Sequence, residues 1–395
     1  MVPSLLPLYL TIFIDVLGFT LVIPLLAYYA QHFGASPLQV GLLNASYAAV
    51  QLFSGPILGA ISDRVGRKKT LVFSQLGTLL GFAVLGGAQS LGMLFAGRMI
   101  AGATAGNLTI AQAYISDVTP PDKRTAAFGI IGIAFGLGFL VGPPASGLIA
   151  QRFGYAAPPL IAAGLSALSA VLTIVRLPDI HRASPGGTSP PPPRRSLSFG
   201  PFLRLPKARL RLLQFLCFIL SFSTLIGGIP LYLERRFHYN VEQTGYVFAF
   251  SGLVGAIIQG GMLRRLVPRL GEERLVAFGL LSMLSHLALG WTYSLPLLLV
   301  VIAVGGFGIS VVRPSLTTLI TRSVPPDQQG AALGVSQSLA SLGQIVGTIT
   351  AGAFIGRGWL VGFGAISAAW AMVGLALQAA APPRDPADPL AGSRR

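Results

Sequence analysis

Long apolar runs alternate with short polar loops along the whole chain. Twelve runs can be separated, at 5–29, 39–61, 70–89, 91–115, 126–150, 155–176, 210–233, 243–266, 274–293, 295–320, 330–355 and 358–380. A helix of about 20 residues is long enough to cross the hydrocarbon core of a bilayer. The pattern therefore predicts an all-α integral membrane protein with twelve transmembrane helices.

The sixth and seventh runs are separated by a segment of different composition. It contains Pro185-Gly186-Gly187, the proline run 190–193 and several basic residues. Such a polar, proline-rich segment cannot bury a core and is typical of a linker. We expect an N-terminal six-helix bundle at 1–176, a cytoplasmic linker at 177–209, a C-terminal six-helix bundle at 210–381 and a cytoplasmic tail at 382–395.

The two sets of six runs are related by a repeat. Thr119-Pro120-Pro121-Asp122 returns as Val324-Pro325-Pro326-Asp327, at an offset of 205 residues. At the same offset five glycines meet glycines: Gly66 and Gly271, Gly129 and Gly334, Gly138 and Gly343, Gly142 and Gly347, and Gly147 and Gly352. This register indicates an internal duplication. Two homologous halves predict a pseudo-symmetric pair of bundles around a site near mid-membrane, which opens alternately to each side.

Composition excludes a water-soluble enzyme. Hydrophobic residues make up 53% of the chain and charged residues only 10%, against about 25% charged residues in soluble domains. The formal net charge of +16 comes from 28 Lys and Arg residues. Most of them lie in loops on one side; Arg152, Arg235, Arg236 and Arg357 lie on the other side, and Arg98 and Arg313 lie inside runs. This asymmetry places both termini in the cytoplasm and requires no nucleic-acid partner.

The loop after the second run carries a motif. The stretch Gly55-Pro-Ile-Leu-Gly59-Ala-Ile-Ser-Asp63-Arg64-Val-Gly66-Arg67-Lys68 resembles the signature loop of the major facilitator superfamily. Arg98 with Gly102 resembles that family's fourth-helix motif. Asp15-Val-Leu-Gly18-Phe19 with Pro24 resembles the first helix of the twelve-helix drug:proton antiporters, especially the tetracycline-efflux-like group. The resemblance implies the major facilitator fold. The third and ninth helices lack the further carboxylates often found in that group.

Asp15 is the candidate proton carrier. It is the one acidic residue near the middle of an apolar run, and a carboxylate at that depth is a functional candidate because it must be paired, protonated or hydrated. Arg98 is the expected partner, since its long side chain could reach the level of Asp15; the alternative is that it extends to the outer interface. Pairing favours the ionised carboxylate and burial favours the neutral acid, so a conformational change could load and unload a proton.

The signature loop predicts a cytoplasmic latch. Asp63 ends the second helix, and pseudo-symmetry places the start of the eleventh helix, near Gln328 to Gly330, close to it. A carboxylate near a helix N-terminus is stabilised by about 0.3–1 kcal/mol. The expected latch consists of Gly59, Asp63, Arg64, Gly66, Arg67, Lys68, Asp117 and Arg124. The alternative is that the basic residues only set topology. Because Glu272, Glu273 and Pro268 replace Arg67, Lys68 and Asp63 in the second half, we expect an asymmetric latch.

The fifth run is rich in glycine. Its motif, which resembles that of the antiporter subfamilies, comprises Gly132, Gly136, Gly138, Gly142, Pro143 and Gly147. Glycines at these spacings let helices approach closely and prolines bend them. The motif predicts a tight, kinked contact that seals the outer half.

The resemblance implies a central cavity lined by helices 1, 2, 4, 5, 7, 8, 10 and 11. The candidate substrate-binding residues there are Phe19, Tyr47, Gln51, Phe135, Phe139, Phe222, Phe248, Arg313, Gln337 and Gln344. Apolar walls with a few polar groups suit an amphipathic organic molecule. Arg313 either binds an anionic substrate group or holds backbone carbonyls exposed by Pro314. His286 is expected to have a structural role rather than to relay protons.

These features predict a proton-coupled efflux antiporter for hydrophobic or amphipathic small molecules, in a bacterial-type inner membrane. No GxxxxGK[ST] motif is present in the sequence, so the energy must come from a proton gradient rather than ATP, and no metal or other cofactor is expected. The expected partners are a small organic substrate, protons and the lipid bilayer, and the chain is expected to be a monomer. Proton symport of an organic anion, lipid flipping and a non-transporting receptor remain as alternatives.

Overall fold

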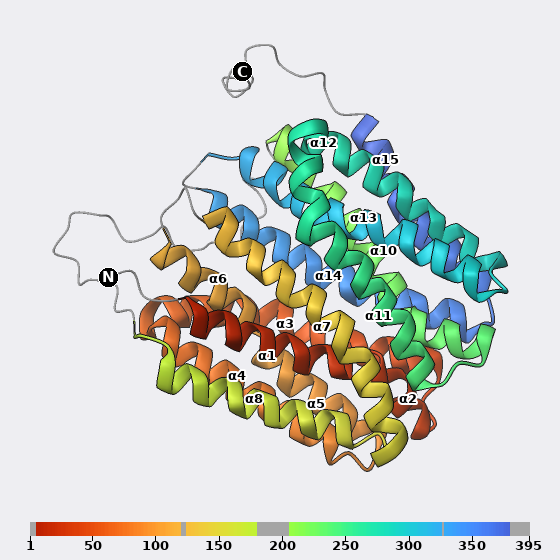
Figure 1. Ribbon diagram of the computed structural model, residues 1–395, viewed down its shortest axis with the longest axis horizontal. Helices are drawn as coiled ribbons and strands as arrows, with labels where there is room; N and C mark the ends of the chain where they lie inside the picture. The colour runs from red at the N-terminus through yellow and green to blue at the C-terminus, as the bar shows by residue number, and fades with distance from the viewer. Residues whose placement is uncertain (1–4, 120–123, 180–204, 326–327, 380–395) are drawn as a thin grey trace.

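The computed structural model describes residues 5–119, 124–179, 205–325 and 328–379, and every regular element in these ranges is a helix (Figure 1). The helices of the first half are α1 (Leu6–Val22), α2 (Leu25–His32), α3 (Pro37–Val65), α4 (Arg67–Gly86), α5 (Leu91–Ala103), α6 (Asn107–Val118), α7 (Arg124–Phe153) and α8 (Ala157–Arg176). Most of the expected linker and tail lies outside the described residues.

The second half is also helical throughout its described residues. Its elements are α10 (Pro206–Phe237), α11 (Val241–Ile257), the π-helix η1 (Ile258–Met262), α12 (Leu263–Met283), the 3-10 helix η2 (Leu284–Trp291), α13 (Leu295–Arg322), α14 (Gln329–Gly356) and α15 (Leu360–Ala379).

Eight of the described helical stretches are long and apolar enough to cross a membrane, and the pair α1 and α2, bent by 41°, would make a ninth. The expected second span, α3, is one continuous helix that is not among these stretches, and two other differences from the expected twelve spans have local structural causes. The stretch Val241–Trp291 is continuous in hydrogen bonding but contains two expected spans, because Gly271 breaks the helical path with φ 75° and ψ 159°. The fourth span is divided into α5 and α6 by a break after Ala103.

The duplication is visible in the backbone. Gly66 ends α3 with φ 108°, and its repeat equivalent Gly271 has φ 75°. A side chain strains the backbone in this region of φ, so glycine suits both corners. Capping boxes also open the second helix of each half, where Ser36 caps α3 and Asn240 caps α11. The two halves therefore share a glycine corner and a helix-capping box as well as the pattern of hydrophobic spans.

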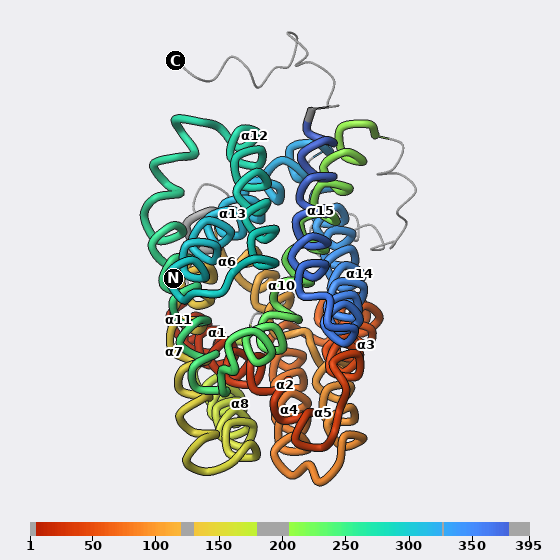
Figure 2. Tube along the Cα trace, turned by 90° about the vertical axis from the view of Figure 1, so that its right-hand side faces the viewer, coloured from red at the N-terminus to blue at the C-terminus, as the bar shows by residue number. Residues whose placement is uncertain are grey.

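The two halves meet along two helix pairs. Helix α3 packs against α14 and α7 packs against α11, as the view in Figure 2 shows. A Cβ atom on Gly147 would lie 2.5 Å from Cα of Glu242, and one on Gly352 would collide with the carbonyl of Pro37. Gly147 and Gly352 are repeat equivalents, and so are the segments they meet: the Gly147 position also lies near the carbonyl of Val241 and the Gly352 position near Cα of Leu38, so Val241 matches Pro37 and Glu242 matches Leu38. The same close contact thus occurs twice, once on each side of the pseudo-symmetry axis.

Helices α3 and α14 separate toward their other ends. A Cβ atom on Gly41 would lie 2.5 Å from the carbonyl oxygen of Thr348. Gly55 lies fourteen residues after Gly41 and Gly334 fourteen residues before Thr348, which is about four helical turns along the same faces. A Cβ atom on Gly55 or Gly334 would meet nothing within 4 Å. The interface between these helices is therefore closed at the end expected to face outward and open at the end expected to face the cytoplasm.

Candidate transport site

Asp15 lies on α1 in a polar cluster formed by three other helices. Its Oδ2 atom accepts a hydrogen bond of 2.9 Å from Nδ2 of Asn107, the first residue of α6. Gln75 on α4 and Ser169 on α8 also lie beside the carboxylate. The Oδ1 atom is buried and forms no hydrogen bond of good geometry with any described residue. One oxygen of Asp15 is thus held in place while the other can accept a proton.

The walls of this cluster are fixed by hydrogen bonds. Nε2 of Gln75 donates to Oγ of Ser169 at 2.7 Å, and Oγ of Ser166 donates to the backbone carbonyl of Gln75 at 2.9 Å. Gln75 and Ser169 are both 0% exposed. These bonds join α4 to α8 beside α1, so Asp15 sits against a rigid polar wall within the first half.

Arg98 is not the partner of Asp15 in this structure, which corrects the sequence-based expectation. Its guanidinium lies over the ring of Tyr47, 4.3 Å from the centroid, and the two side chains form no ion pair. The reason is position along the span: nine residues, or about 13 Å of helix, separate Arg98 from Asn107. Arg98 is 4% exposed, so it does not extend to the outer surface either.

One expected cavity residue, Tyr47, contacts Arg98, and a second, Phe19, lies beside Tyr47. The ring of Phe19 lies 6.3 Å from that of Tyr47, which links α1, α3 and α5. Half-buried positions include Phe19, Tyr47, Gln51, Phe135, Phe139, Phe222 and Gln344, whereas Gln337 is exposed. Phe222 stacks on Phe218 with centroids 6.1 Å apart. Phe248 is 3% exposed within an apolar cluster, so its expected role as a substrate contact is corrected to packing.

Arg313 faces away from the lipid-exposed side of α13. Leu297, Val300 and Val304 are exposed apolar residues that mark the lipid face. Arg313 comes nine residues after Val304, which is two and a half turns, so it points to the opposite side. Its side chain is exposed and has no hydrogen-bond or ion-pair partner among the described residues. An unpaired guanidinium therefore faces the interior of the protein rather than lipid.

The π-helix η1 was not foreseen from the sequence. Oε1 of Gln259 lies 3.0 Å from the position of a Cβ atom on Gly132, so this turn reaches α7 of the other half. A signal for it exists in the repeat: Ser36 and Gly41 match Asn240 and Gly245 at an offset of 204, whereas the offset is 205 after the turn. A π-turn accommodates one additional residue in a helix and is frequent at functional sites. Gln259 occupies the place of that insertion.

The glycine motif of α7 forms the expected close contacts. Gly138 and Gly142 pack on Thr20, whose Oγ1 donates to the carbonyl of Gly138 at 2.9 Å. Toward the second half, Gly132 faces Gln259 and Gly136 faces Ala256. A Cβ atom on Gly245 would lie 2.5 Å from the carbonyl oxygen of Pro143. Helix α7 continues through Pro143 and Pro144, and its contact with α11 closes one side of the interface.

Polar bonds across the two halves support this closure. The hydroxyl group of Tyr28 donates to the carbonyl of Tyr239 at 3.0 Å and lies 2.6 Å from Oγ1 of Thr244. Nε2 of Gln31 donates to Oε2 of Glu234 at 2.6 Å. These residues lie at the end of the molecule that is expected to face outward.

The signature loop forms part of the expected charge network. Arg67, 6% exposed, pairs with Asp63 at 2.6 Å and with Asp117 at 2.9 Å. Gly59 is buried on α3, Gly66 forms the corner and Arg64 is exposed, whereas the side chain of Arg124 lies outside the described residues. The bonds of Arg67 hold together the ends of α3, α4 and α6 that are expected to face the cytoplasm.

His286 belongs to a hydrogen-bonded packing contact. Its Nδ1 atom lies 3.0 Å from Oγ of Ser367, which donates to the carbonyl of Ser221 at 3.0 Å. The residue is 1% exposed. These bonds connect η2, α15 and α10, which supports the expected structural role.

The sequence profile of the Major Facilitator Superfamily matches residues 8–285 and 265–394. The class C tetracycline resistance protein of Escherichia coli is 30% identical, over 89% of this chain and 91% of its own length. The class G protein of Vibrio anguillarum is 31% identical, with 88% and 91% covered. The crystal structure of the human organic anion transporter MFSD10 (TETRAN) has a TM-score of 0.74 and 25% identity, over 95% of this chain and 97% of that chain.

Proposed function

Since the chain belongs to the major facilitator superfamily and is a multi-pass membrane transporter rather than an enzyme, we propose that it is a proton-coupled antiporter. It exports hydrophobic or amphipathic organic molecules from the cytoplasm across a bacterial-type inner membrane, as a monomer with both termini in the cytoplasm. Its likeness to tetracycline resistance proteins supports this substrate class.

The observation that carries the proposal is the environment of Asp15. An acid within the first span has one oxygen held by Asn107, and its other oxygen is buried with no hydrogen bond of good geometry from the described residues. A buried carboxylate with an unsatisfied oxygen gains from binding a proton. When the halves move and water reaches Asp15, the ionised form gains hydration and the proton leaves. Asp15 thereby couples proton movement to the alternation of the two halves.

Alternating access follows from the two helix-pair contacts. The close contacts at Gly147 and Gly352 hold the outer end together, and α3 and α14 separate toward the cytoplasm. In the opposite state the cytoplasmic ends approach. The register of α3 and α14, with Pro37 beside Gly352, then brings Asp63 level with the start of α14. There its carboxylate closes the latch against the helix N-terminus.

The experiment is a proteoliposome assay with an internal pH dye and a panel of cationic, neutral and anionic amphipathic compounds. The wild type should move protons opposite to at least one compound. Asp15→Asn should lose gradient-driven accumulation and retain exchange of substrate for substrate, because a neutral amide can still allow the halves to alternate. Normal uphill transport by Asp15→Asn would overturn the proposal.

A second candidate is proton symport of an organic anion. It is favoured by the unpaired guanidinium of Arg313 and by likeness to a human organic anion transporter. The same assay separates the two: symport acidifies the compartment that receives substrate, whereas antiport makes it more alkaline.

A further inference from the structure

Basic residues are scarce on the side of the chain expected to face outward, yet three of the four outer arginines gather at one place. Arg235 and Arg236 end α10, and Arg357 follows α14. Nη1 of Arg235 donates to the carbonyl of Ile355, two residues before Arg357. The fourth outer arginine, Arg152, ends α7 in the other half. Basic residues on the outer side oppose the charge bias that sets topology. The grouping of these arginines is therefore not explained by topology and indicates a local ligand or partner.

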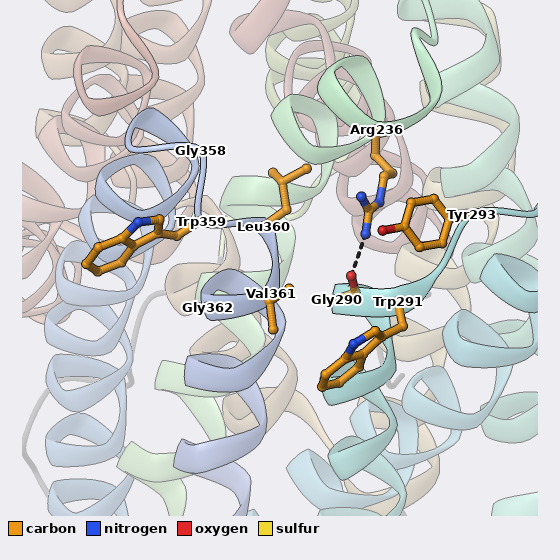
Figure 3. A pocket seen from close by; sticks show the side chains of 9 residues that line it. All are labelled: Arg236, Gly290, Trp291, Tyr293, Gly358, Trp359, Leu360, Val361 and Gly362. Atoms are coloured by element: carbon orange, nitrogen blue, oxygen red, sulfur yellow. Dashed lines mark hydrogen bonds between the residues drawn. The ribbon is translucent and has the colours of Figure 1, made fainter.

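Arg236 lines a surface notch of about 420 Å³ (Figure 3), and Arg357 directly precedes Gly358, another residue of its lining. Its lining comes from the end of α10, the end of η2 with the following loop, and the start of α15. Three aromatic side chains at the notch are largely exposed: Trp291 by 59%, Tyr293 by 73% and Trp359 by 59%. In Figure 3 the two tryptophans lie on either side of Leu360 and Val361. Exposed Trp and Tyr at the end of a spanning bundle are typical of the lipid headgroup level.

Arg236 provides a fixed positive charge in the notch. Its guanidinium lies 3.9 Å from the centroid of the Tyr293 ring. Its Nε donates to the carbonyl of Thr292 at 3.2 Å, and its Nη2 donates to the carbonyl of Gly290. No carboxylate pairs with it in the described part of the chain. The charge is thus held in position by neutral groups and is not neutralised.

Arg235 and Arg357 are exposed beside residues that adjoin the notch and keep donors available: Arg235 bonds to the carbonyl of Ile355 through Nη1 alone. Arg357 contacts Trp359, 6.0 Å from the ring centroid, and forms no ion pair among the described residues. Guanidinium groups bind phosphate oxygens through paired N–H donors. Trp291 and Trp359 offer indole N–H groups and apolar faces beside them. The notch therefore combines positive charge, hydrogen-bond donors and an apolar floor that continues toward the membrane at Leu360 and Val361.

We propose that this notch binds the phosphate headgroup of an outer-leaflet phospholipid, which joins the ends of α10, η2 and α15. The phosphate lies near Arg235, Arg236 and Arg357, and the upper acyl chain lies along Leu360, Val361 and the tryptophans. The proposal rests on the orientation proposed above but not on proton coupling. Bound lipid would brace the outer end of the second half while the two halves move.

The test uses the full chain purified in detergent, with bound lipid counted by native mass spectrometry and thermal unfolding measured in parallel. The probes are phosphatidylglycerol, diacylglycerol without a headgroup, and inorganic phosphate. Wild type should retain phosphatidylglycerol and gain several degrees in Tm, and the other two probes should have no effect. The variant Arg235→Gln/Arg357→Gln, which leaves the hydrogen bonds of Arg236 intact, should bind phosphatidylglycerol at least fivefold more weakly.

Arg152→Gln is the matched control, since it removes the one outer arginine that lies away from the notch. Equal loss in this control would show a general charge effect and overturn the proposal. Stabilisation by diacylglycerol or by inorganic phosphate alone would also overturn it. Trp359→Leu gives a second test if the double variant folds poorly: it should weaken lipid retention while uphill transport by the protein continues.

Discussion

Glu272 and Arg322 form an ion pair of 3.0 Å that is the charge-reversed counterpart of a pair in the first repeat. Arg67 and Asp117 occupy the equivalent positions, 205 residues earlier, and pair at 2.9 Å. The sequence comparison between halves predicted an asymmetric latch, because basic residues of the first loop become acidic in the second. The structure shows that the sign is exchanged while the contact is kept. In both halves the pair joins the third helix of the repeat to the end of the fourth.

The exchanged sign predicts that the second pair can be reversed. Glu272→Arg should lower the Tm by about 2–4 °C, since it places two positive charges together at a partly exposed site worth about 1 kcal/mol. Glu272→Arg/Arg322→Asp should restore most of that loss, because it recreates the arrangement of Arg67 and Asp117. The test is made in the second half because Arg67 also pairs with Asp63, so a substitution of Arg67 would break two ion pairs at once. If the double variant is no more stable than Glu272→Arg, the ion pair does not stabilise the contact between the two helices that it joins.

The outer seal predicts equal effects at repeat-equivalent glycines. Gly147→Ala and Gly352→Ala each place a methyl group against the backbone of the opposite half, so each should disfavour the outward-closed state and lower the transport rate about tenfold. Spin labels at Gln89 and Tyr293, exposed positions on the two halves, should show longer distances by pulsed spectroscopy. Gly164→Ala, which faces open space, is the control and should leave both measurements unchanged.

Asn107 is predicted to affect how strongly proton movement is coupled to substrate transport. Asn107→Ala removes the 2.9 Å hydrogen bond to Asp15. A hydrogen bond to a charged group contributes about 1.5 kcal/mol, which corresponds to roughly a tenfold change in rate or equilibrium. Gradient-driven uptake into inverted vesicles should therefore fall about tenfold, and substrate exchange should be nearly unaffected. Thr109→Ala on the same helix serves as control; an equal fall in exchange would argue for a general packing defect.

The residue inserted at the π-helix η1 offers a further test. Deletion of Gln259 should turn η1 into continuous α-helix, as at the equivalent place in α3, and should leave a folded protein that transports poorly because the helix loses the turn that reaches Gly132 on α7. Gln259→Ala keeps the turn but removes the amide, so it should raise the apparent KM about threefold to tenfold with little change in maximal rate. Transport kinetics of the two variants show whether the π-turn of the backbone or the amide group of Gln259 is needed for transport. The Tm of each variant checks that it is folded.

The sequence predicted the features that depend on the residues along a single helix. It did not predict which side chains meet, because that depends on how neighbouring helices are rotated relative to one another. The apolar runs and the isolated acid Asp15 follow from hydropathy alone, and the glycine spacing of α7 predicted its close contacts. The partner of Asp15 could not be obtained in this way. Arg98 and Asn107 lie on one span, and only the break after Ala103 and the packing of α6 bring the amide, not the guanidinium, to the carboxylate. The π-turn was detectable only as a change of one residue in the repeat offset.

We expect Arg313 to favour anionic substrates in the proposed transport cycle. Its guanidinium is exposed on the interior side of α13 and has no described partner, so an anionic group entering from the cytoplasm can replace water around it. A charged hydrogen bond of this kind contributes about 1.5–3 kcal/mol, so Arg313→Gln should weaken transport of anionic amphipathic compounds at least tenfold and that of neutral compounds less than threefold. Arg313→Lys, which keeps the charge, should recover part of the loss. If both variants affect anionic and neutral compounds equally, Arg313 instead holds the helix around Pro314, and the Tm of Arg313→Gln should then be lowered along with its transport.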